Sequence, residues 1–159
     1  MDTQTVKRQK EEHGIKEVSF KKLVKLLTAI EHGVNLMHYL IEHNREEAYV
    51  VALISAEKID LPIEIRAQKR DTDILFEVDV EKNLYAILCQ GTQVDGGYYF
   101  IQRLVTKLQE AGAENIYCSE LEVSNTQHPV QELAFRLLNM YQHNQKHRLD
   151  GEINFRSLK

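Results

Sequence analysis

The chain has 159 residues, of which 43% are hydrophobic and 28% charged, as is typical of one soluble globular domain. Its formal net charge of -4 is spread along the sequence without an acidic or basic block, so we expect no nucleic-acid partner. No apolar run approaches the roughly 20 residues needed to cross a bilayer, and the polar N-terminus lacks the apolar core of a secretion signal. These features predict a cytoplasmic protein without a membrane segment.

The N-terminal residues 1–18 are mostly polar and contain Gly14, which interrupts a helical pattern. We therefore expect a flexible tail there and a single domain over 19–159. Ser19 is a suitable N-cap for an amphipathic helix, because apolar residues follow it at helical spacing: Phe20, Leu23, Val24, Leu27 and Ile30. A second apolar run follows, and the pattern leaves open whether 19–44 forms one helix or two.

The next apolar run, 48–54, is continuous and bounded by charged residues, which is typical of a strand buried on both faces. We interpret it as the central strand of a sheet. The connection after it, 55–69, is short and contains Pro62, which fits the first turn of a short helix but not the interior of a sheet.

Two adjacent apolar runs, 74–80 and 84–88, are rich in β-branched and aromatic residues, and the polar residues 81–83 between them indicate a hairpin. The glycine-containing segment 90–97 then breaks the strand pattern. From Tyr98 the apolar positions follow a period near 3.6, which predicts an amphipathic helix with a buried face made of Ile101, Leu104, Val105, Leu108 and Ala111. We expect the rest of the chain to pack around this hairpin and helix.

A further strand is predicted over 115–123, after Gly112 ends the preceding helix. Pro129 opens a last amphipathic helix, whose apolar face consists of Val130, Leu133, Ala134, Leu137, Leu138 and Tyr141. Apolar residues alternate over 153–158, as they do in an edge strand. This order of elements predicts an α+β fold with a largely antiparallel sheet covered by helices.

Metal and disulfide chemistry have little support in the sequence. Cys89 and Cys118 lie in strand-like runs and lack a Cys-x-x-Cys partner, so we expect buried free thiols. The seven histidines show no metal-binding spacing. We therefore predict neither a metal ion nor a cofactor.

The run from Arg70 to Val78, the hairpin after it and the helix containing Arg103 and Leu104 resemble the second half of a GGDEF domain. That family makes cyclic di-GMP from two GTP molecules on a βαββαβ core related to nucleotidyl cyclases. The resemblance extends over about residues 48–142. It implies a bacterial signalling protein with that core, here with a reduced first crossover helix and an N-terminal helical extension.

In the family, an Arg-x-x-Asp sequence five residues before the signature hairpin forms an inhibitory site for the product. Arg70 and Asp73 fit this sequence and position. The resemblance therefore implies that they are ligand-binding residues for cyclic di-GMP, since arginine offers a planar fork of donors to guanine and phosphate. The alternative is a surface ion pair that precedes a strand.

The departures from the family concern catalysis. Where the family has Gly-Gly-Asp/Glu-Glu-Phe at the hairpin tip, this chain has Asp79-Val-Glu-Lys-Asn-Leu-Tyr85, without the paired glycines that let the backbone approach GTP. Ser55 stands where the family has a metal-binding aspartate, and nearby only Glu57 is acidic. Two Mg²⁺ ions on triphosphates need several hard oxygen ligands. The connection 55–69 is also too short for the guanine-contacting segment and the full helix of the family.

These departures predict a catalytically inactive GGDEF-like module with a regulatory or scaffolding role, no catalytic residues, and cyclic di-GMP as its candidate ligand. One alternative is a protein-interaction domain without a nucleotide ligand, in which the N-terminal helices form a homodimer or dock an unidentified protein. Another is a small nucleotide-processing enzyme with rearranged metal ligands at Glu57, Asp79 and Glu81.

Overall fold

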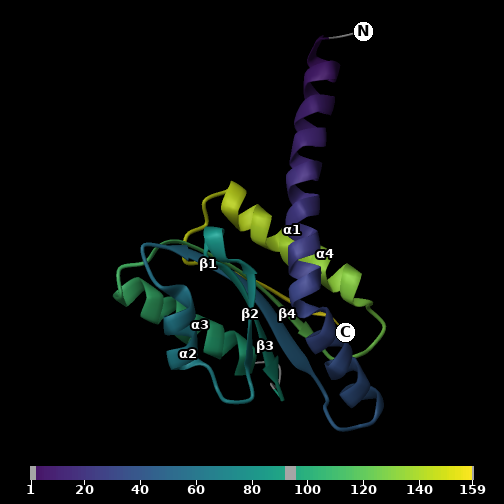
Figure 1. Ribbon diagram of the computed structural model, residues 1–159, viewed down its shortest axis with the longest axis vertical. Helices are drawn as coiled ribbons and strands as arrows, with labels where there is room; N and C mark the ends of the chain where they lie inside the picture. The colour runs from purple at the N-terminus through teal and green to yellow at the C-terminus, as the bar shows by residue number, and fades with distance from the viewer. Residues whose placement is uncertain (1–2, 92–95, 159) are drawn as a thin grey trace.

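The computed structural model describes the backbone of residues 3–91 and 96–158, and their side chains from Phe20 onward except at 96–97 (Figure 1). The turn that we expected between 90 and 97 lies mostly outside the described residues. In chain order the elements are α1 (Thr3–Glu42), β1 (Tyr49–Glu57), α2 (Leu61–Gln68), β2 (Ile74–Asp79), η1 (Val80–Lys82, a 3-10 turn), β3 (Leu84–Gln90), α3 (Gly96–Glu110), β4 (Glu114–Val123), α4 (Val130–Lys146) and β5 (Ile153–Leu158).

The sheet has the strand order β2-β3-β1-β4-β5, with β1 in the centre. β1 pairs antiparallel with β3 and β4, so Val51 lies between Leu88 and Leu121. The hairpin strand β2 pairs antiparallel with β3, and the edge strand β5 pairs parallel with β4. The predicted α+β fold, with a largely antiparallel sheet and the central strand beside the hairpin, is confirmed.

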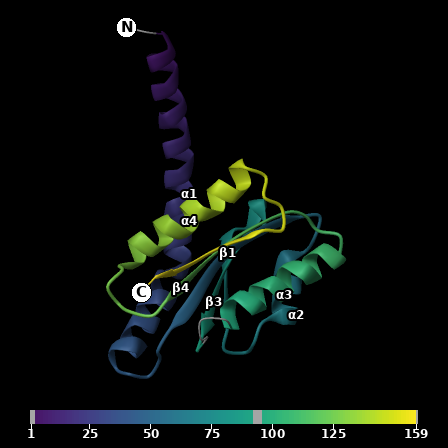
Figure 2. The same ribbon diagram turned by 180° about the vertical axis from the view of Figure 1, so that it is seen from behind.

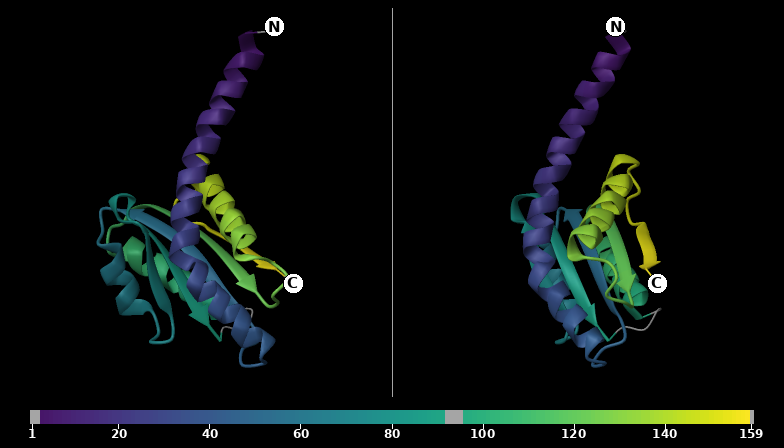
Figure 3. Two further views of the ribbon diagram at one scale, coloured as in Figure 1. Left: turned by 45° about the vertical axis from the view of Figure 1, so that its right-hand side comes forward. Right: turned by 90° about the vertical axis from the view of Figure 1, so that its right-hand side faces the viewer.

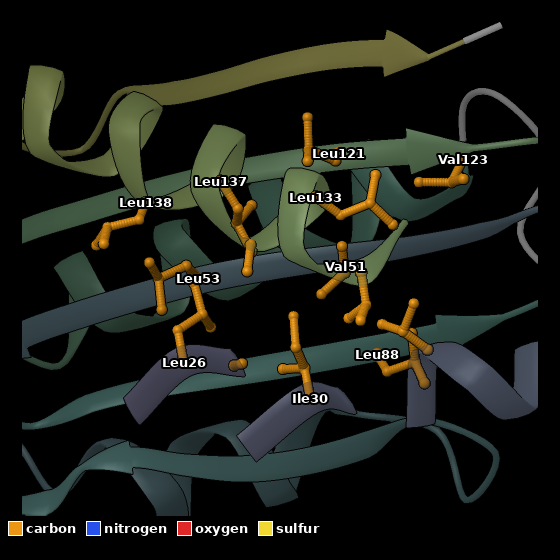
Figure 4. Close-up of a cluster of buried hydrophobic side chains, with 14 of the residues drawn as sticks. Leu26, Ile30, Val51, Leu53, Leu88, Leu121, Val123, Leu133, Leu137 and Leu138 are labelled. Carbon is orange, nitrogen blue, oxygen red and sulfur yellow. The ribbon is translucent and has the colours of Figure 1, made fainter. Parts of the chain in front are cut away.

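Helices cover both faces of the sheet (Figure 3). α1 and α4 pack on one face and α2 and α3 on the other, and alternate residues of β1 enter the two cores, with Val51 and Leu53 on the α1 side and Val50 and Ala52 on the α3 side. Figure 4 shows the α1/α4 core, where Leu26 and Ile30 point toward the side chains of β1. Burying each such side chain stabilises the fold by roughly 1.5–3 kcal/mol.

α1 differs from the sequence prediction, because it is one continuous helix of 40 residues that begins at Thr3 instead of Ser19. The segment 1–18, expected to be a flexible tail, is helical from Thr3 on. Its lysine, arginine, glutamine and glutamate residues are good helix formers, and a single glycine such as Gly14 costs a helix only about 1 kcal/mol. Figures 1 and 2 show this N-terminal half extending past the sheet.

Gly33 lies inside α1 because the helix approaches the hairpin closely there. A Cβ atom at this position would lie 2.9 Å from Cζ of Phe76 on β2 and 3.2 Å from Cδ2 of Leu88 on β3. The residue that looked like a helix break is therefore a contact point between α1 and the sheet. The sequence left open whether 19–44 forms one helix or two; it forms one, which ends at Glu42.

The connection between β1 and β2 contains the eight-residue helix α2, with Pro62 in its first turn. The reduced crossover helix is thereby confirmed. Cys89 and Cys118 are buried free thiols, as the sequence predicted. In the described part of the chain, no helix is both long and apolar enough to span a membrane.

Candidate functional site

Arg70 and Asp73 meet at the start of β2 and form an ion pair, which is the alternative that the sequence left open beside ligand binding. Nη2 of Arg70 donates to Oδ1 of Asp73 at 2.8 Å, and Nε lies 3.2 Å from both carboxylate oxygens. The backbone N–H of Arg70 donates to Oδ2 at 2.9 Å, which closes the turn before the strand. The hydrogen bond to Asp73 raises the pKa of the guanidinium.

The same arginine also ties the two hairpin strands together. Its Nη2 donates to the backbone oxygen of Gln90, at the end of β3, at 2.8 Å. The side chain of Asp73 is fully buried, whereas that of Arg70 is 50% exposed. Half of the Arg70 side chain is therefore open to solvent, while the Asp73 carboxylate is already occupied from within the protein.

The opposite end of the hairpin is fixed by Asn83, which follows η1. Asn83 has φ 51° and ψ 45°, a left-handed conformation that asparagine tolerates better than most residues. Its Nδ2 donates to the backbone oxygens of Ala56 at 2.8 Å and Ile59 at 3.1 Å. The hairpin turn is thus held against the end of β1.

Ser55, near the end of β1, faces α4. Its Oγ lies 2.6 Å from the hydroxyl of Tyr141, and both side chains are buried. Burial raises the pKa of the Tyr141 hydroxyl. Two residues further, Glu57 is exposed and accepts a hydrogen bond from Nδ2 of Asn115 at 2.7 Å.

Two hollows adjoin the hairpin turn. One, of about 400 Å³, lies where β1 ends and includes Ser55, Glu57, Lys58 and Tyr141 in its lining. The other, of about 530 Å³, lies between α1 and the hairpin turn, and we call it the lysine groove; it is lined by Phe20, Lys21, Lys22, Val24, Lys25, Asp79, Glu81 and Lys82. The two hollows share Lys22, Glu81 and Lys82.

The charged side chains that line the lysine groove shift one another's pKa values. Asp79 is 8% exposed and pairs with Nζ of Lys25 at 3.1 Å. Burial tends to raise the pKa of Asp79, but hydrogen bonds from Lys25 and from the backbone of Lys82, together with the charges of both lysines, lower the pKa below its ordinary value. The pKa of Lys22 is also lowered, first by burial and then by the charge of Lys82.

Among the side chains that the structure describes, those of residues 20–91 and 98–158, no group of three or more histidine, cysteine, aspartate or glutamate residues is arranged to hold a metal ion. Of the three residues considered for a rearranged metal site, Glu57 and Glu81 line the same hollow, and Asp79 and Glu81 line the lysine groove. Glu57 accepts a hydrogen bond from Asn115, and Asp79 is paired with Lys25.

Sequence reasoning missed Lys22, Asn83 and Tyr141 as residues around these hollows. Lys22 and Tyr141 come from helices far from the hairpin in sequence, so no local pattern places them there. Asn83 carried a usable signal, because asparagine in a tight connection favours a left-handed turn.

The sequence matches no protein-family model and no curated protein. Solved structures do share its fold. A microbial GGDEF domain described for its interaction with cyclic di-GMP has a TM-score of 0.55 and 12% identity, over 82% of this chain and 96% of that one. The chain has a GGDEF-like fold.

Two further structures agree with this assignment. The diguanylate cyclase SiaD from Pseudomonas aeruginosa, in complex with its activator SiaC, has a TM-score of 0.57 and 9% identity, covering 96% of this chain and 70% of SiaD. A diguanylate cyclase/phosphodiesterase from Caldicellulosiruptor saccharolyticus has a TM-score of 0.52 and 9% identity, covering 80% of this chain and 86% of that one. At these identities the likeness concerns the fold of the GGDEF domain.

Proposed function

We propose that this chain is a catalytically inactive GGDEF-like module that acts by binding, as a regulatory or scaffolding component of signalling in the bacterial cytoplasm. The observation that carries the proposal is the environment of Ser55. Its hydroxyl is engaged by Tyr141 at the position where the resemblance implies a metal-binding carboxylate. Lys22 and Lys82 line the hollow in front of it.

The neighbouring residues support the same conclusion. Mg²⁺ requires oxygen ligands, and an ammonium group both lacks a lone pair and repels the ion. Asp79, the buried carboxylate at the hairpin turn, is neutralised by Lys25. The side chains of Val80, Glu81 and Lys82 also occupy the turn, where paired glycines would leave space for GTP.

Titration with Mn²⁺, followed by electron paramagnetic resonance, tests the proposal at the site itself. We expect no specific Mn²⁺ binding, with or without GTP. As a matched comparison, Ser55→Asp returns a carboxylate to the end of β1. Stoichiometric Mn²⁺ binding by the unmodified chain that disappears in Glu57→Gln would contradict the proposal.

Cyclic di-GMP is the ligand that we propose for this module, bound through the outer edge of Arg70. Half of the Arg70 side chain is exposed at the end of the hairpin, and the microbial GGDEF domain of similar fold was described for its interaction with this dinucleotide. Because Asp73 is buried beneath the guanidinium, we assign it the role of orienting Arg70.

Calorimetry with cyclic di-GMP tests this assignment. We expect binding by the unmodified chain and a loss of at least about tenfold in Arg70→Ala, as for removal of a charge-assisted hydrogen bond. Arg70→Lys retains the charge but loses the fork, so it should also weaken binding. Arg156→Ala, at an exposed position on the far edge strand, is the control. Equal affinity in Arg70→Ala would remove the receptor role and leave a scaffolding module.

Dimerisation is the protein-interaction form of this proposal. It is supported by the N-terminal half of α1, which extends past the sheet (Figure 1), and by the exposed side chain of Phe20 on that helix. Light scattering of the full chain over a range of concentrations should then show a dimer. A monomer at every concentration would argue for a different partner.

A further inference from the structure

We propose that the lysine groove is a metal-independent binding site for a small phosphate-bearing ligand with an apolar or aromatic body. The groove lies at the turn end of the hairpin, whereas Arg70 lies at the opposite end, beside the last residue of β3. It is therefore a site separate from the Arg-x-x-Asp pair.

The first argument is charge. Four lysines line the groove against two carboxylates, although the whole chain carries a net charge of -4. Lys25 is paired with Asp79. Within the part of the chain that the structure describes, Lys21, Lys22 and Lys82 make no ion pair, and Glu81 is the remaining carboxylate beside them. The described lining of the groove therefore has more positive than negative side chains.

The second argument is the crowding of these cations. Lys22 is half-buried; burial, and secondly the charge of Lys82, lower its pKa, while the charge of Asp79 raises it, so the ammonium groups of Lys22 and Lys82 repel each other beside one carboxylate. An anion between them would relieve this repulsion and accept hydrogen bonds from both. Lysine is a common phosphate ligand because its ammonium presents three donors as a compact charge.

The third argument is the shape and apolar part of the groove. Its volume of about 530 Å³ lies within the range of small-molecule sites. Phe20 and Val24, one turn apart on α1, line it and are 66% and 46% exposed. Because these side chains adjoin the lysines, the ligand should combine a phosphate with an apolar or aromatic body, as nucleoside phosphates do.

The inference rests on the proposed function in one respect, since it takes the neighbourhood of Ser55 to be free of metal chemistry. The test is calorimetry in EDTA at low ionic strength, with inorganic pyrophosphate and ADP as probes. We expect both to bind, ADP more tightly, and both to weaken as salt screens the lysines.

Variants locate the site. Lys22→Gln and Lys82→Gln should each weaken both probes by about tenfold. Phe20→Ala should weaken ADP and leave pyrophosphate unchanged. Lys107→Gln, on the opposite face of the sheet, is the matched control and should bind as the unmodified chain does. Thermal melting of each variant confirms that it is folded.

Three results would overturn the inference. They are absence of binding at millimolar probe, a requirement for Mg²⁺, or affinity that survives in the Lys22→Gln/Lys82→Gln double variant. Loss of pyrophosphate binding in Arg70→Ala would also overturn it, because the anion would then lie at the other end of the hairpin. Turnover of GTP alongside intact binding in EDTA would contradict the proposed function and leave the groove as assigned.

Discussion

Glu120 is a carboxylate with no visible partner in the core. The residue is fully buried, and neither of its carboxylate oxygens has a hydrogen-bond partner among the described residues. It lies opposite Ala52 on the α3 face of the sheet, with Glu122 two residues further along the same strand. Burial, and secondly the charge of Glu122, raise the pKa of Glu120 to about 8. The side chain is therefore mostly protonated at neutral pH.

This shift predicts a stability that falls as pH rises. The folded state holds the Glu120 proton more tightly than the unfolded chain, where the pKa of this carboxyl is near 4.5. The stability that comes from this tighter proton binding is therefore fully present below pH 4.5 and is lost by about pH 8. Glu120→Gln should remove this loss and stabilise the protein at pH 8.5 by on the order of 2–4 kcal/mol. Urea denaturation at pH 5, 7 and 8.5 measures it, with exposed Glu47→Gln as the control. Parallel pH profiles for Glu120→Gln and the unmodified chain would refute the prediction.

Asn83 permits a second prediction at this scale. Asn83→Ala loses the two hydrogen bonds to the end of β1 and places a non-glycine residue in the left-handed region, so it should destabilise the protein by about 2–4 kcal/mol. Asn83→Gly accepts the backbone conformation and should lose only the hydrogen-bond part. Thermal or urea unfolding distinguishes the two. Equal losses in both variants would mean that the backbone conformation costs nothing.

At the scale of elements, α1 is positioned by its contact at Gly33. Gly33→Ala adds a Cβ within 2.9 Å of the Phe76 ring, which should outweigh the gain in helix propensity and destabilise the protein by about 1–2 kcal/mol. Phe76→Leu should restore part of this loss in the double variant, because the shorter side chain makes room for the methyl group. A stabilising Gly33→Ala would show that α1 can shift freely on the sheet.

The strands and the later helices were predictable because their periods are strong. The central strand is continuously apolar, and the α3 and α4 faces repeat at helical spacing. The start of α1 was not predictable, since the polar residues of 1–18 carry no apolar face and Gly14 and Gly33 both resembled helix ends. The spacing of Arg70 and Asp73 left open whether they bind a ligand or pair with each other, and the bond from Arg70 to Gln90 depends on the strand register.

At the scale of the whole molecule, the lysine groove could not be predicted. Its residues come from 20–25 and 79–82, which meet only because α1 packs across the hairpin, and the net charge of -4 gave no sign of a positive site. The fold was predictable from the hairpin outward, whereas the hollows depend on helices that are remote in sequence. The binding role that we propose rests on three features: the GGDEF-like fold, the lysines around the hairpin turn, and the Ser55–Tyr141 pair.

The central claim is that this scaffold binds without catalysing. Its most direct test is incubation of the purified chain with GTP and Mg²⁺ or Mn²⁺, followed by chromatographic separation of the nucleotides, with an active diguanylate cyclase as the positive control. We predict that GTP is recovered unchanged and that no cyclic di-GMP forms. Cyclic di-GMP produced by the unmodified chain, and abolished by Glu57→Gln, would contradict the account.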